Sequence, residues 1–362
     1  MMAAFSDVFA DVTKQGTKLQ TSEYLASGKY PIIDQGQDDI AGYTDRENGL
    51  FTDVPAIIFG DHTRIIKYVD MPFFLGADGV KVLKATIPNV DYRYLYYAVS
   101  AVKIPNTGYN RHFKWLKEAQ IPLPDISTQR RIADTLDKVA EGIALCRKMM
   151  DELDLMVKAK FVEMFGDPML NPNRYALKKY GELFELNAGG TPSKAKPEYW
   201  ENGTISWIGS NLCQNTILYE NDGKYISQEG YEHSSARLFP ADTVLIALVG
   251  ATIGKTALLK FETSTNQNVL GIRQIAEAGY NPLFVFYFTQ FLYPKFLNIG
   301  DGGFNMASKG FVSELPMYDI NIEKQNEFAE FAKLLDKSKL TIQEICDKME
   351  MEKLALMQEY FR

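Results

Sequence analysis

The fold is decided by residues 129–165, QRRIADTLDKVAEGIALCRKMMDELDLMVKAKFVEMF, in which apolar side chains recur at steps of three and four. The apolar residues of this stretch are Ile132, Leu136, Val139, Ile143, Cys146, Met150, Leu153, Val157, Phe161 and Met164. Charged residues fill the positions between them. A heptad seam held over this length predicts one long coiled-coil helix. Asp125 or Ser127 can cap its start, and Gly166-Asp167-Pro168 ends it.

A second helical segment near the end of the sequence repeats the first. Its seam consists of Phe328, Ala332, Leu335, Ile342, Ile345, Met349 and Leu356, with one polar interruption at Ser338 or Lys339. Gln129 aligns with Gln325 at an offset of 196 residues, whereas Leu136 aligns with Leu335 at an offset of 199. The alignment therefore predicts a gap of three residues within the repeat. Because both seams need burial and the chain returns between them, we expect the two helices to pack antiparallel.

The two longer segments that precede these helices read as globular domains. Each contains short strands separated by Gly, Asn and Asp turns, together with one aromatic-rich helix, which predicts an α+β fold. Residues 28–33 match 203–208, and residues 56–60 match 246–250. The sequence thus predicts four parts, which are a globular domain at 1–120, a helix at 121–168, a second globular domain at 169–315 and a second helix at 316–362.

The net charge of −7 and the pI near 5.3 exclude binding to nucleic acid through the overall charge of the protein. Any such contact needs basic side chains gathered on one surface. The longest nearly apolar stretches, residues 242–254 and 282–294, are shorter than the roughly 18–20 residues that span a bilayer. The three cysteines are far apart, which argues against a disulfide framework or a zinc site. We therefore expect a soluble, cytoplasmic protein without a signal peptide.

Motifs that suggest an enzyme fail on their spacing. In residues 250–256, GATIGKT, a P-loop would need a glycine at Val249, so we interpret the segment as a hairpin turn. Residues 281–284, NPLF, resemble a loop of amino-methyltransferases, but no glycine-rich cofactor loop precedes them, and a helix N-terminus capped by Asn281 explains them better. Asp222-Gly223-Lys224 lacks the carboxylate partner of a nuclease site. The three histidines are too scattered for a metal site or a catalytic triad.

Small, polar and basic loops recur at matching places in the two globular domains, and the clearest runs from Gly189 to Lys196. Such loops suit contacts with phosphates and base edges through N–H, hydroxyl and ammonium donors, and their amides can pair with adenine. The candidate DNA-binding residues of the first domain are Lys14, Thr17, Lys18, His62, Thr63, Arg64, Tyr109, Asn110, Arg111 and Lys114. Those of the second domain are Gly189, Gly190, Thr191, Ser193, Lys194, Lys196, Thr252, Lys255, Asn266, Gln267, Asn268, Asn305 and Lys309.

Taken together, these motifs resemble the specificity subunits of type I restriction-modification systems, and the resemblance covers essentially the whole chain. It rests on LNAGGTPS at 186–193, followed by PEYW at 197–200 and ISWI at 205–208, and on GATIGK at 250–255. It rests also on IPLP at 121–124 and on QRRIA at 129–133, which opens the first helix. The first domain departs from the pattern, with KQGTK at 14–18 in place of the Gly-Gly-Thr-Pro loop.

The resemblance implies a subunit without catalysis of its own. Each globular domain would be a target-recognition domain that reads one half of a split, asymmetric site in double-stranded DNA. The helices would hold the domains apart and dock modification (methyltransferase) subunits, and two similar helical surfaces favour two copies. Motor-nuclease restriction subunits would join through that core. The chain itself would bind no metal or cofactor, and the partner subunits would hold S-adenosylmethionine, ATP and Mg²⁺.

Two other classes of protein remain open on the sequence. One is a single-chain DNA methyltransferase or nuclease with duplicated recognition domains, which a cofactor loop or a carboxylate cluster would reveal. The other is a scaffold that joins proteins without DNA, which the nearly neutral globular domains permit. Salt-dependent binding of DNA separates the scaffold from the DNA-binding proteins.

Overall fold

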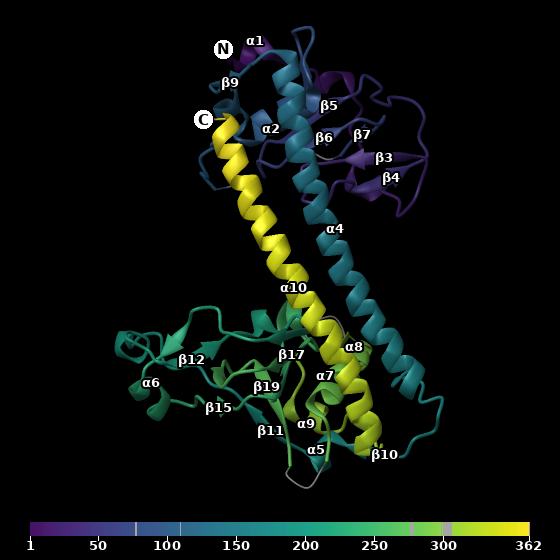
Figure 1. Ribbon diagram of the computed structural model, residues 1–362, viewed down its shortest axis with the longest axis vertical. Helices are drawn as coiled ribbons and strands as arrows, with labels where there is room; N and C mark the ends of the chain where they lie inside the picture. Colours follow the sequence, from purple (N-terminus) through teal and green to yellow (C-terminus); the bar gives the residue numbers. More distant parts are fainter. Residues whose placement is uncertain (77, 109, 276–278, 298, 300–305, 362) are drawn as a thin grey trace. The chain divides into compact units, whose positions relative to one another are not determined.

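The computed structural model describes residues 1–76, 78–108, 110–275, 279–297, 299 and 306–361 (Figure 1). The chain forms two compact units, of which the first contains Met1–Lys148 and Gln343–Arg362 and the second contains Met149–Ile342. Each unit therefore combines one globular part with one half of each long helix, α4 (Ile126–Phe165) and α10 (Ile322–Phe361). The four-part division predicted from the sequence cuts the chain differently, and its boundaries stay predictions.

The globular part of the first unit consists of β1 (Met2–Ala4), α1 (Phe5–Val8), β2 (Phe9–Asp11), η1 (Thr13–Gln15), η2 (Thr21–Glu23), β3 (Tyr30–Ile33), β4 (Gly42–Thr44), β5 (Ala56–Gly60), β6 (Ile66–Val69), β7 (Phe74–Leu75), β8 (Val80–Ala85), α2 (Tyr92–Ser100), α3 (Phe113–Lys117) and β9 (Gln120–Pro122). Its main sheet has the strand order β2-β8-β5-β6, and a smaller sheet has the order β4-β3-β7. β1 pairs with β9. The strand pairs are antiparallel, except for the parallel pair β3-β7.

The globular part of the second unit consists of β10 (Leu177–Lys179), α5 (Tyr180–Leu183), β11 (Phe184–Ala188), η3 (Pro197–Tyr199), β12 (Ile205–Ile208), η4 (Ser210–Leu212), β13 (Thr216–Leu218), β14 (Tyr225–Ile226), α6 (Gln228–Glu232), β15 (Leu238–Phe239), β16 (Val244–Ala247), η5 (Gly250–Thr252), β17 (Thr256–Leu259), β18 (Thr263–Thr265), β19 (Val269–Gln274), α7 (Pro282–Phe291), α8 (Tyr293–Leu297), α9 (Lys309–Ser313) and β20 (Pro316–Tyr318). Its sheets have the orders β11-β19-β16-β17-β13 and β14-β12-β18-β15, and β10 pairs with β20.

The two globular parts share one topology, as the sequence repeat predicts. The main sheet β2-β8-β5-β6 corresponds to β11-β19-β16-β17, and the parallel pair β3-β7 corresponds to β12-β18. The match of residues 56–60 with 246–250 is wrong by three positions. Gly60 pairs with Val80 at the start of β8, and Ala247 pairs with Val269 at the start of β19. Gly60 is therefore equivalent to Ala247, because strand pairing sets the register.

The two long helices are equivalent along their whole length. Both begin and end at positions 196 residues apart, so the repeat contains no gap, and the predicted gap of three residues is wrong. At the constant offset Leu136 is equivalent to Ala332, and both side chains are buried. The second seam also passes through Cys346, which is buried, whereas the predicted seam residue Ile345 is 46% exposed.

Contacts inside each unit confirm that the helices run antiparallel. In the first unit Arg147 of α4 pairs with Glu350 of α10 at 2.6 Å, and Ile132 lies beside Tyr360. In the second unit Asp154 of α4 pairs with Lys339 of α10 at 2.6 Å, and Phe161 meets Phe328 at 5.1 Å. Within each unit, the number of the partner on α10 falls as the residue number rises along α4. Lys339 belongs to the polar interruption that the sequence predicts.

Each globular part packs on the start of one long helix and the end of the other. In the first unit Leu136 of α4 enters the core, and Phe361 of α10 lies against Tyr94 with ring centres 5.4 Å apart. In the second unit Phe161 of α4 stacks on Phe284 of α7 and meets Phe328 of α10 edge-on. The antiparallel arrangement makes this possible, because it brings a helix start beside a helix end.

Side-chain caps begin the helices where the sequence predicts them. Asp125 accepts hydrogen bonds from Ser127 and from the N–H of Thr128, and the bond from Ser127 contributes most to a lowered pKa of this carboxyl. Asp91 caps α2 and Asn281 caps α7, which confirms the helix N-terminus expected at Asn281. No helix in the described part of the chain is long and apolar enough to cross a membrane.

Replacing Leu136 or Ile143 by Ala should lower the free energy of unfolding by about 2–5 kcal/mol, because each is a buried seam side chain. Leu145→Ala is the matched control, since Leu145 lies on the same helix and is 57% exposed, and it should change stability by less than about 0.5 kcal/mol. Chemical denaturation of the three variants measures the difference. Equal stabilities for Leu136→Ala and Leu145→Ala would contradict burial of the seam.

Candidate nucleic-acid interface

In the second unit the predicted residues gather at one edge of the main sheet. The C-terminal ends of β11 and β16 and the N-terminal ends of β17 and β19 form this edge. The loop after β11 is tied to the loop before β19 by two hydrogen bonds. The N–H of Gly190 donates to the carbonyl of Thr265 (2.8 Å), and the hydroxyl of Thr191 donates to the side chain of Gln267 (2.6 Å). Residues far apart in the sequence thus share one surface.

The turn between β16 and β17 lies at the same edge and is the hairpin turn that the sequence predicts. The N–H of Leu248 donates to the carbonyl of Asn268 (2.8 Å), and the N–H of Ala307 donates to the carbonyl of Leu248 (2.8 Å). The ammonium of Lys255 donates to the side chain of Gln214 (2.8 Å). These bonds join the turn that contains Thr252 and Lys255 to the segment of Asn266 and Asn268 and to Ala307, two residues before Lys309. Asn305 lies outside the described residues.

Gly189 and Gly190 are buried, and their N–H groups are already used. The N–H of Gly189 donates to the carbonyl of Val269 (3.0 Å), as that of Gly190 does to Thr265. A Cβ on Gly189 would come within 2.1 Å of the Thr265 hydroxyl, and one on Gly190 within 2.3 Å of the Ser235 backbone. Both N–H groups thus have partners inside the protein, and contact of Gly189 and Gly190 with DNA stays a prediction. Both residues are glycine because the backbones pack too closely for any side chain.

The predicted lysines of the second unit differ in their exposure and in their hydrogen bonds. Lys194 and Lys309 are exposed. Lys196 donates to the hydroxyl of Tyr199 at 2.8 Å, and this hydrogen bond raises the pKa of Lys196. Ser193 of the same loop is exposed, and its backbone carbonyl accepts a hydrogen bond from the Trp200 indole (3.3 Å). Tyr199 and Trp200 thus hold the basic loop through hydrogen bonds to Lys196 and Ser193.

In the first unit one glutamine organises the equivalent edge. Gln35, which follows β3, accepts from the N–H of His62 (3.1 Å) and donates to the carbonyl of Asp78 (2.8 Å). The backbone carbonyl of Gln35 accepts a hydrogen bond from the hydroxyl of Thr63 (2.6 Å). The imidazole Nδ1 of His62 lies 3.2 Å from the carbonyl oxygen of Asn110. The predicted segments around residues 62 and 110 are therefore in contact.

The remaining predicted residues of the first unit lie around this network, apart from Tyr109, which is outside the described residues. Lys18 pairs with Asp78 at 3.0 Å, and half-buried Thr17 accepts from the N–H of Leu75 through its carbonyl. Arg64 has a left-handed backbone (φ 64°), and its guanidinium lies 3.5 Å from the Ile104 carbonyl. Of the predicted basic residues of this unit, Lys14, Lys18, Arg111 and Lys114 are exposed.

Sequence reasoning missed the polar residues that follow β3 and β12. These are Gln35 in the first unit, and Asn211 and Gln214 in the second, which are both exposed at the interface edge. The sequence match could have identified them, because Gln35 follows the matched segment 28–33, and Asn211 and Gln214 follow the matched segment 203–208. The strand ends share one edge of the structure, which the sequence match alone did not reveal.

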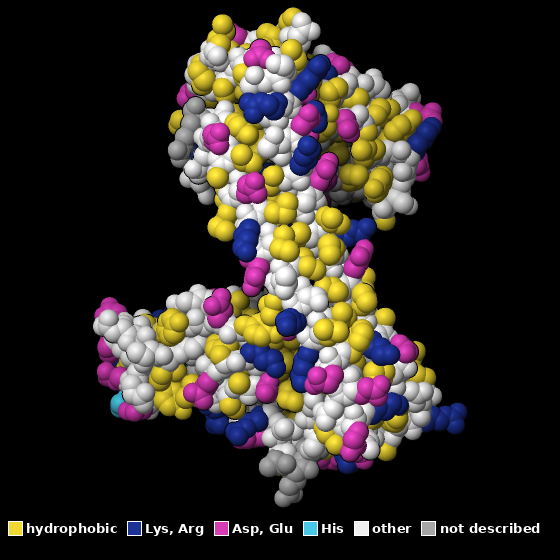
Figure 2. Space-filling model, in the orientation of Figure 1, with side chains coloured by type: hydrophobic (Ala, Val, Ile, Leu, Met, Phe, Trp, Pro, Cys, Tyr) yellow, Lys and Arg dark blue, Asp and Glu magenta, His cyan; other side chains and the backbone are white. Residues whose placement is uncertain are grey.

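Charge at these edges is local. Figure 2 shows Lys and Arg side chains mixed with Asp and Glu over the visible face, without one broad basic belt. This agrees with the nearly neutral charge of each globular segment. Among the described residues, no group of three or more His, Cys, Asp or Glu side chains is placed to hold a metal ion. The edges therefore offer amides, hydroxyls and single cations, which are groups that contact phosphates and base edges.

A family model described as the type I restriction modification DNA specificity domain matches residues 4–155 and 172–350. The chain belongs to this family. It is a specificity subunit of the type I restriction-modification class, with two DNA-recognition domains and no catalytic role of its own. The two matched segments correspond to the two halves of the repeat. Nothing in these comparisons supports a single-chain methyltransferase or nuclease.

Relatives with assigned names include the EcoR124I/EcoR124II specificity subunit of Escherichia coli. It is 28% identical over 284 residues, which cover 72% of this chain and 69% of the relative. The MjaIX specificity subunit of Methanocaldococcus jannaschii is 32% identical over 124 residues, covering 33% and 28%. The S subunit structure from M. genitalium shares the fold, with a TM-score of 0.60 at 17% identity over 100% of this chain and 96% of that one.

Replacing Lys194 by Ala should weaken DNA binding equally for all sequences and reduce the slope of log affinity against log salt by about one. The reason is that an exposed lysine on the interface releases a counterion when it meets a phosphate. Lys260→Ala is the control, because Lys260 follows the opposite end of β17 and pairs with Asp242 there. Titrations of the assembled complex at several salt concentrations measure both slopes. An unchanged slope for Lys194→Ala would remove this lysine from the interface.

Proposed function

We propose that each unit reads one half of a bipartite, asymmetric site in double-stranded DNA through the sheet edge described above. The observation that carries this proposal is that equivalent strand ends form a polar edge twice, with different side chains each time. Gln35, His62 and Asn110 mark the first edge, whereas Thr191, Gln267 and Lys255 mark the second. One topology with two sets of side chains suits two different half-sites.

The side chains, rather than the backbone, carry recognition in this proposal. The N–H groups of Gly189 and Gly190 are bonded within the protein, so they offer nothing to a phosphate. Amides such as Asn211 and Gln267 can make paired hydrogen bonds with adenine in the major groove, and exposed lysines can hold the backbone. The half-site sequence is therefore determined by these few side chains and their placement.

We propose further that the paired helices dock two modification subunits. In the first unit the exposed apolar residues of α4 and α10 include Leu145, Met351 and Leu354. In the second unit they include Leu155, Met156 and Leu334. Apolar side chains of this size on a helical surface are typical of protein interfaces. One such surface in each unit favours two copies of the partner.

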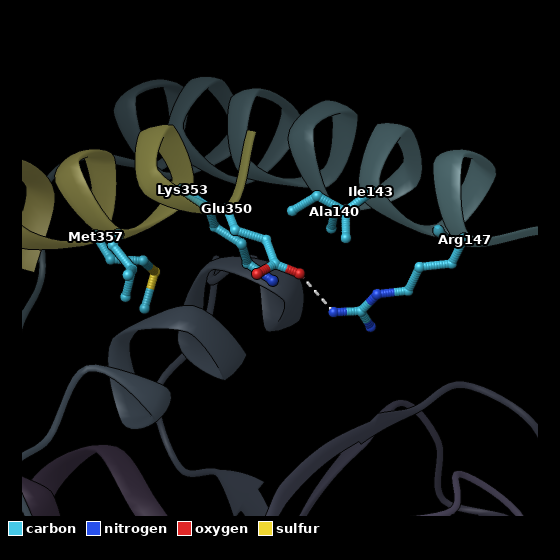
Figure 3. Close-up of a pocket in the computed structure, with 8 residues that line it drawn as sticks. Ala140, Ile143, Arg147, Glu350, Lys353 and Met357 are labelled. Carbon is cyan, nitrogen blue, oxygen red and sulfur yellow. Dashed lines mark hydrogen bonds and ion pairs between the residues drawn. The ribbon is translucent and has the colours of Figure 1, made fainter. Parts of the chain in front are cut away.

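A groove between the helices of the first unit supports this docking surface. It measures about 480 Å³ and is lined by Ala140, Ile143, Ala144, Arg147, Glu350, Lys353, Leu354 and Met357. Figure 3 shows the Arg147–Glu350 pair beside it, with Ala140 and Ile143 on α4 and Lys353 and Met357 on α10. An apolar floor with a charged rim is the usual anatomy of a protein interface.

In this proposal the chemistry belongs to the partners. Modification subunits bring S-adenosylmethionine, and motor-nuclease restriction subunits bring ATP and Mg²⁺, so this chain binds no cofactor. The assembly works in the cytoplasm, where its DNA is. The proposal is tested with the full chain, purified alone and together with its modification subunit, by transfer of labelled methyl groups to DNA.

The chain alone should transfer no methyl group, and the assembled complex should methylate adenine in one bipartite sequence. Sequencing of methylated adenines in cells that carry both genes gives that sequence. Methyl transfer by the chain free of partner, or methylation of a continuous undivided site by the complex, would contradict the proposal.

The long helices should set the gap between the half-sites. Each has 40 residues and is about 60 Å long at ~1.5 Å per residue. Four residues inserted into both helices, after Ala144 and after Ile345, keep the antiparallel pair in register, because Ile143 and Cys346 pack in one buried cluster at this level of the two helices. The insertion adds about 6 Å, which is one to two base pairs at ~3.4 Å each. Mapping of methylated sites should show unchanged half-sites and a longer spacer.

The insertion into α4 alone is the control, since it leaves four residues of one helix without a partner. It should cost more stability than the paired insertion. An unchanged spacer in the paired variant would show that the helices do not measure the gap.

A further inference from the structure

Each unit buries one glutamine in the first turns of a long helix. Gln129 is the fourth residue of α4 and is 3% exposed, and Gln325 is the fourth residue of α10 and is 0% exposed. Buried glutamines are uncommon, because a primary amide must find partners for its oxygen and its nitrogen. Both glutamines do so in the same way.

The amide of Gln129 joins three elements of the first unit. Its oxygen accepts from the N–H of Asp91, the residue that caps α2, at 3.1 Å. Its nitrogen donates to the carbonyl of Pro124, between β9 and α4, at 2.8 Å. The side chain itself belongs to α4. One amide therefore ties the globular helix α2 to the junction where the long helix begins.

The amide of Gln325 makes the same two bonds in the second unit. Its oxygen accepts from the N–H of Asn281, which caps α7, at 3.0 Å. Its nitrogen donates to the carbonyl of Ile320, between β20 and α10, at 2.8 Å. We call these two arrangements, centred on Gln129 and Gln325, the glutamine clamps.

The side chains around the two clamps differ, although the clamps are alike. Beside the first clamp Arg93 of α2 pairs with Asp134 (2.9 Å) and Asp137 (2.7 Å) of α4. Beside the second clamp α7 meets α10 through aromatic rings, with Tyr287 and Phe328 edge-on at 5.5 Å. The glutamine clamp is therefore the same in both units, although the contacts beside it are ionic in the first unit and aromatic in the second.

The clamp fixes the direction of the globular helix on the long helix. The N–H of a capping residue has no partner within its helix, so a buried cap needs an acceptor from elsewhere. In the first unit α2 is in turn tied to the main sheet, because the hydroxyl of Tyr92 accepts from the N–H of Ala85 in β8 (2.9 Å). β8 begins at the interface edge. A rotation of α2 about its N-terminus would therefore displace that edge.

We propose that Gln129 and Gln325 are positioning residues that set the angle of each recognition domain on its helix, and thereby restrict DNA recognition to one spacing of the half-sites. The inference rests on the proposed function. An ionised Glu accepts but does not donate, so it leaves the Pro124 or Ile320 carbonyl without a donor, and Met leaves both backbone groups without a partner.

The experiment uses the full chain assembled with its modification subunits, carrying Gln129→Glu, Gln129→Met, Gln325→Glu or Gln325→Met. The substrates are duplexes that contain both half-sites, with the natural spacer and with spacers shorter or longer by one and two base pairs. Methylation of the off-spacer duplexes relative to the natural one should rise about tenfold in the variants, as expected when a buried hydrogen bond is lost. The half-site bases should not change.

The control is Leu83→Ala, which removes a buried side chain from the core of the first unit without touching the clamp. It should lower the melting temperature and keep the strict spacing. The Met variants keep the side-chain volume and carry no charge, so they provide a folded complex if the Glu variants unfold. Strict spacing in folded clamp variants would overturn the inference. A wild-type complex that methylates no bipartite site would instead overturn the proposed function, so the two failures are distinguishable.

Discussion

The antiparallel pairing of α4 with α10 is the constraint on which the rest of the structure depends. Within each unit it places the first turns of one helix beside the last turns of the other. Each globular part packs on the surface that these two helix ends form, which we call its seat. In a parallel pair both helix starts would lie together, so neither globular part would have a surface made of one helix start and one helix end. The equal length of the two helices, 40 residues each, follows from this, because two equal seats need two helices of equal length.

The two seats solve the same packing problem with different chemistry. In the first, one guanidinium serves three carboxylates, since Arg93 also lies 3.3 Å from Asp91. Desolvation of Arg93 is outweighed by these hydrogen bonds and charges, which raise its pKa further above its usual range. Because the side chain is partly exposed, the network adds direction more than stability. In the second seat Phe161, Phe284 and Phe328 exclude water instead, and their burial supplies the stability.

The recognition edges show how a tight fold leaves specificity to side chains. Gly189 and Gly190 pack so closely against neighbouring segments that their N–H groups are used inside the protein, which ties this loop to Thr265 and Val269. Lys194 then projects from a rigid base. Rigid loops lose little freedom on binding, so few contacts suffice for selectivity. Changes at exposed positions of the edge can therefore alter the half-site while the scaffold stays the same.

The sequence by itself determined the helices, their pairing and the duplication, and it located the loops that we predict to contact DNA. The steps from Ile132 to Phe161, the caps at Asp125 and Asn281, and the glycines at 189 and 190 are local patterns, and local patterns specify periodicity, helix starts and turns. Only the tertiary structure decided that the seam uses Cys346 rather than Ile345, that the glycine N–H groups are bonded within the protein, and that half-buried Gln35 and buried Gln129 bridge separate segments. The physical reason is that hydrogen-bond partners and burial depend on segments far apart in the chain, which no local pattern records.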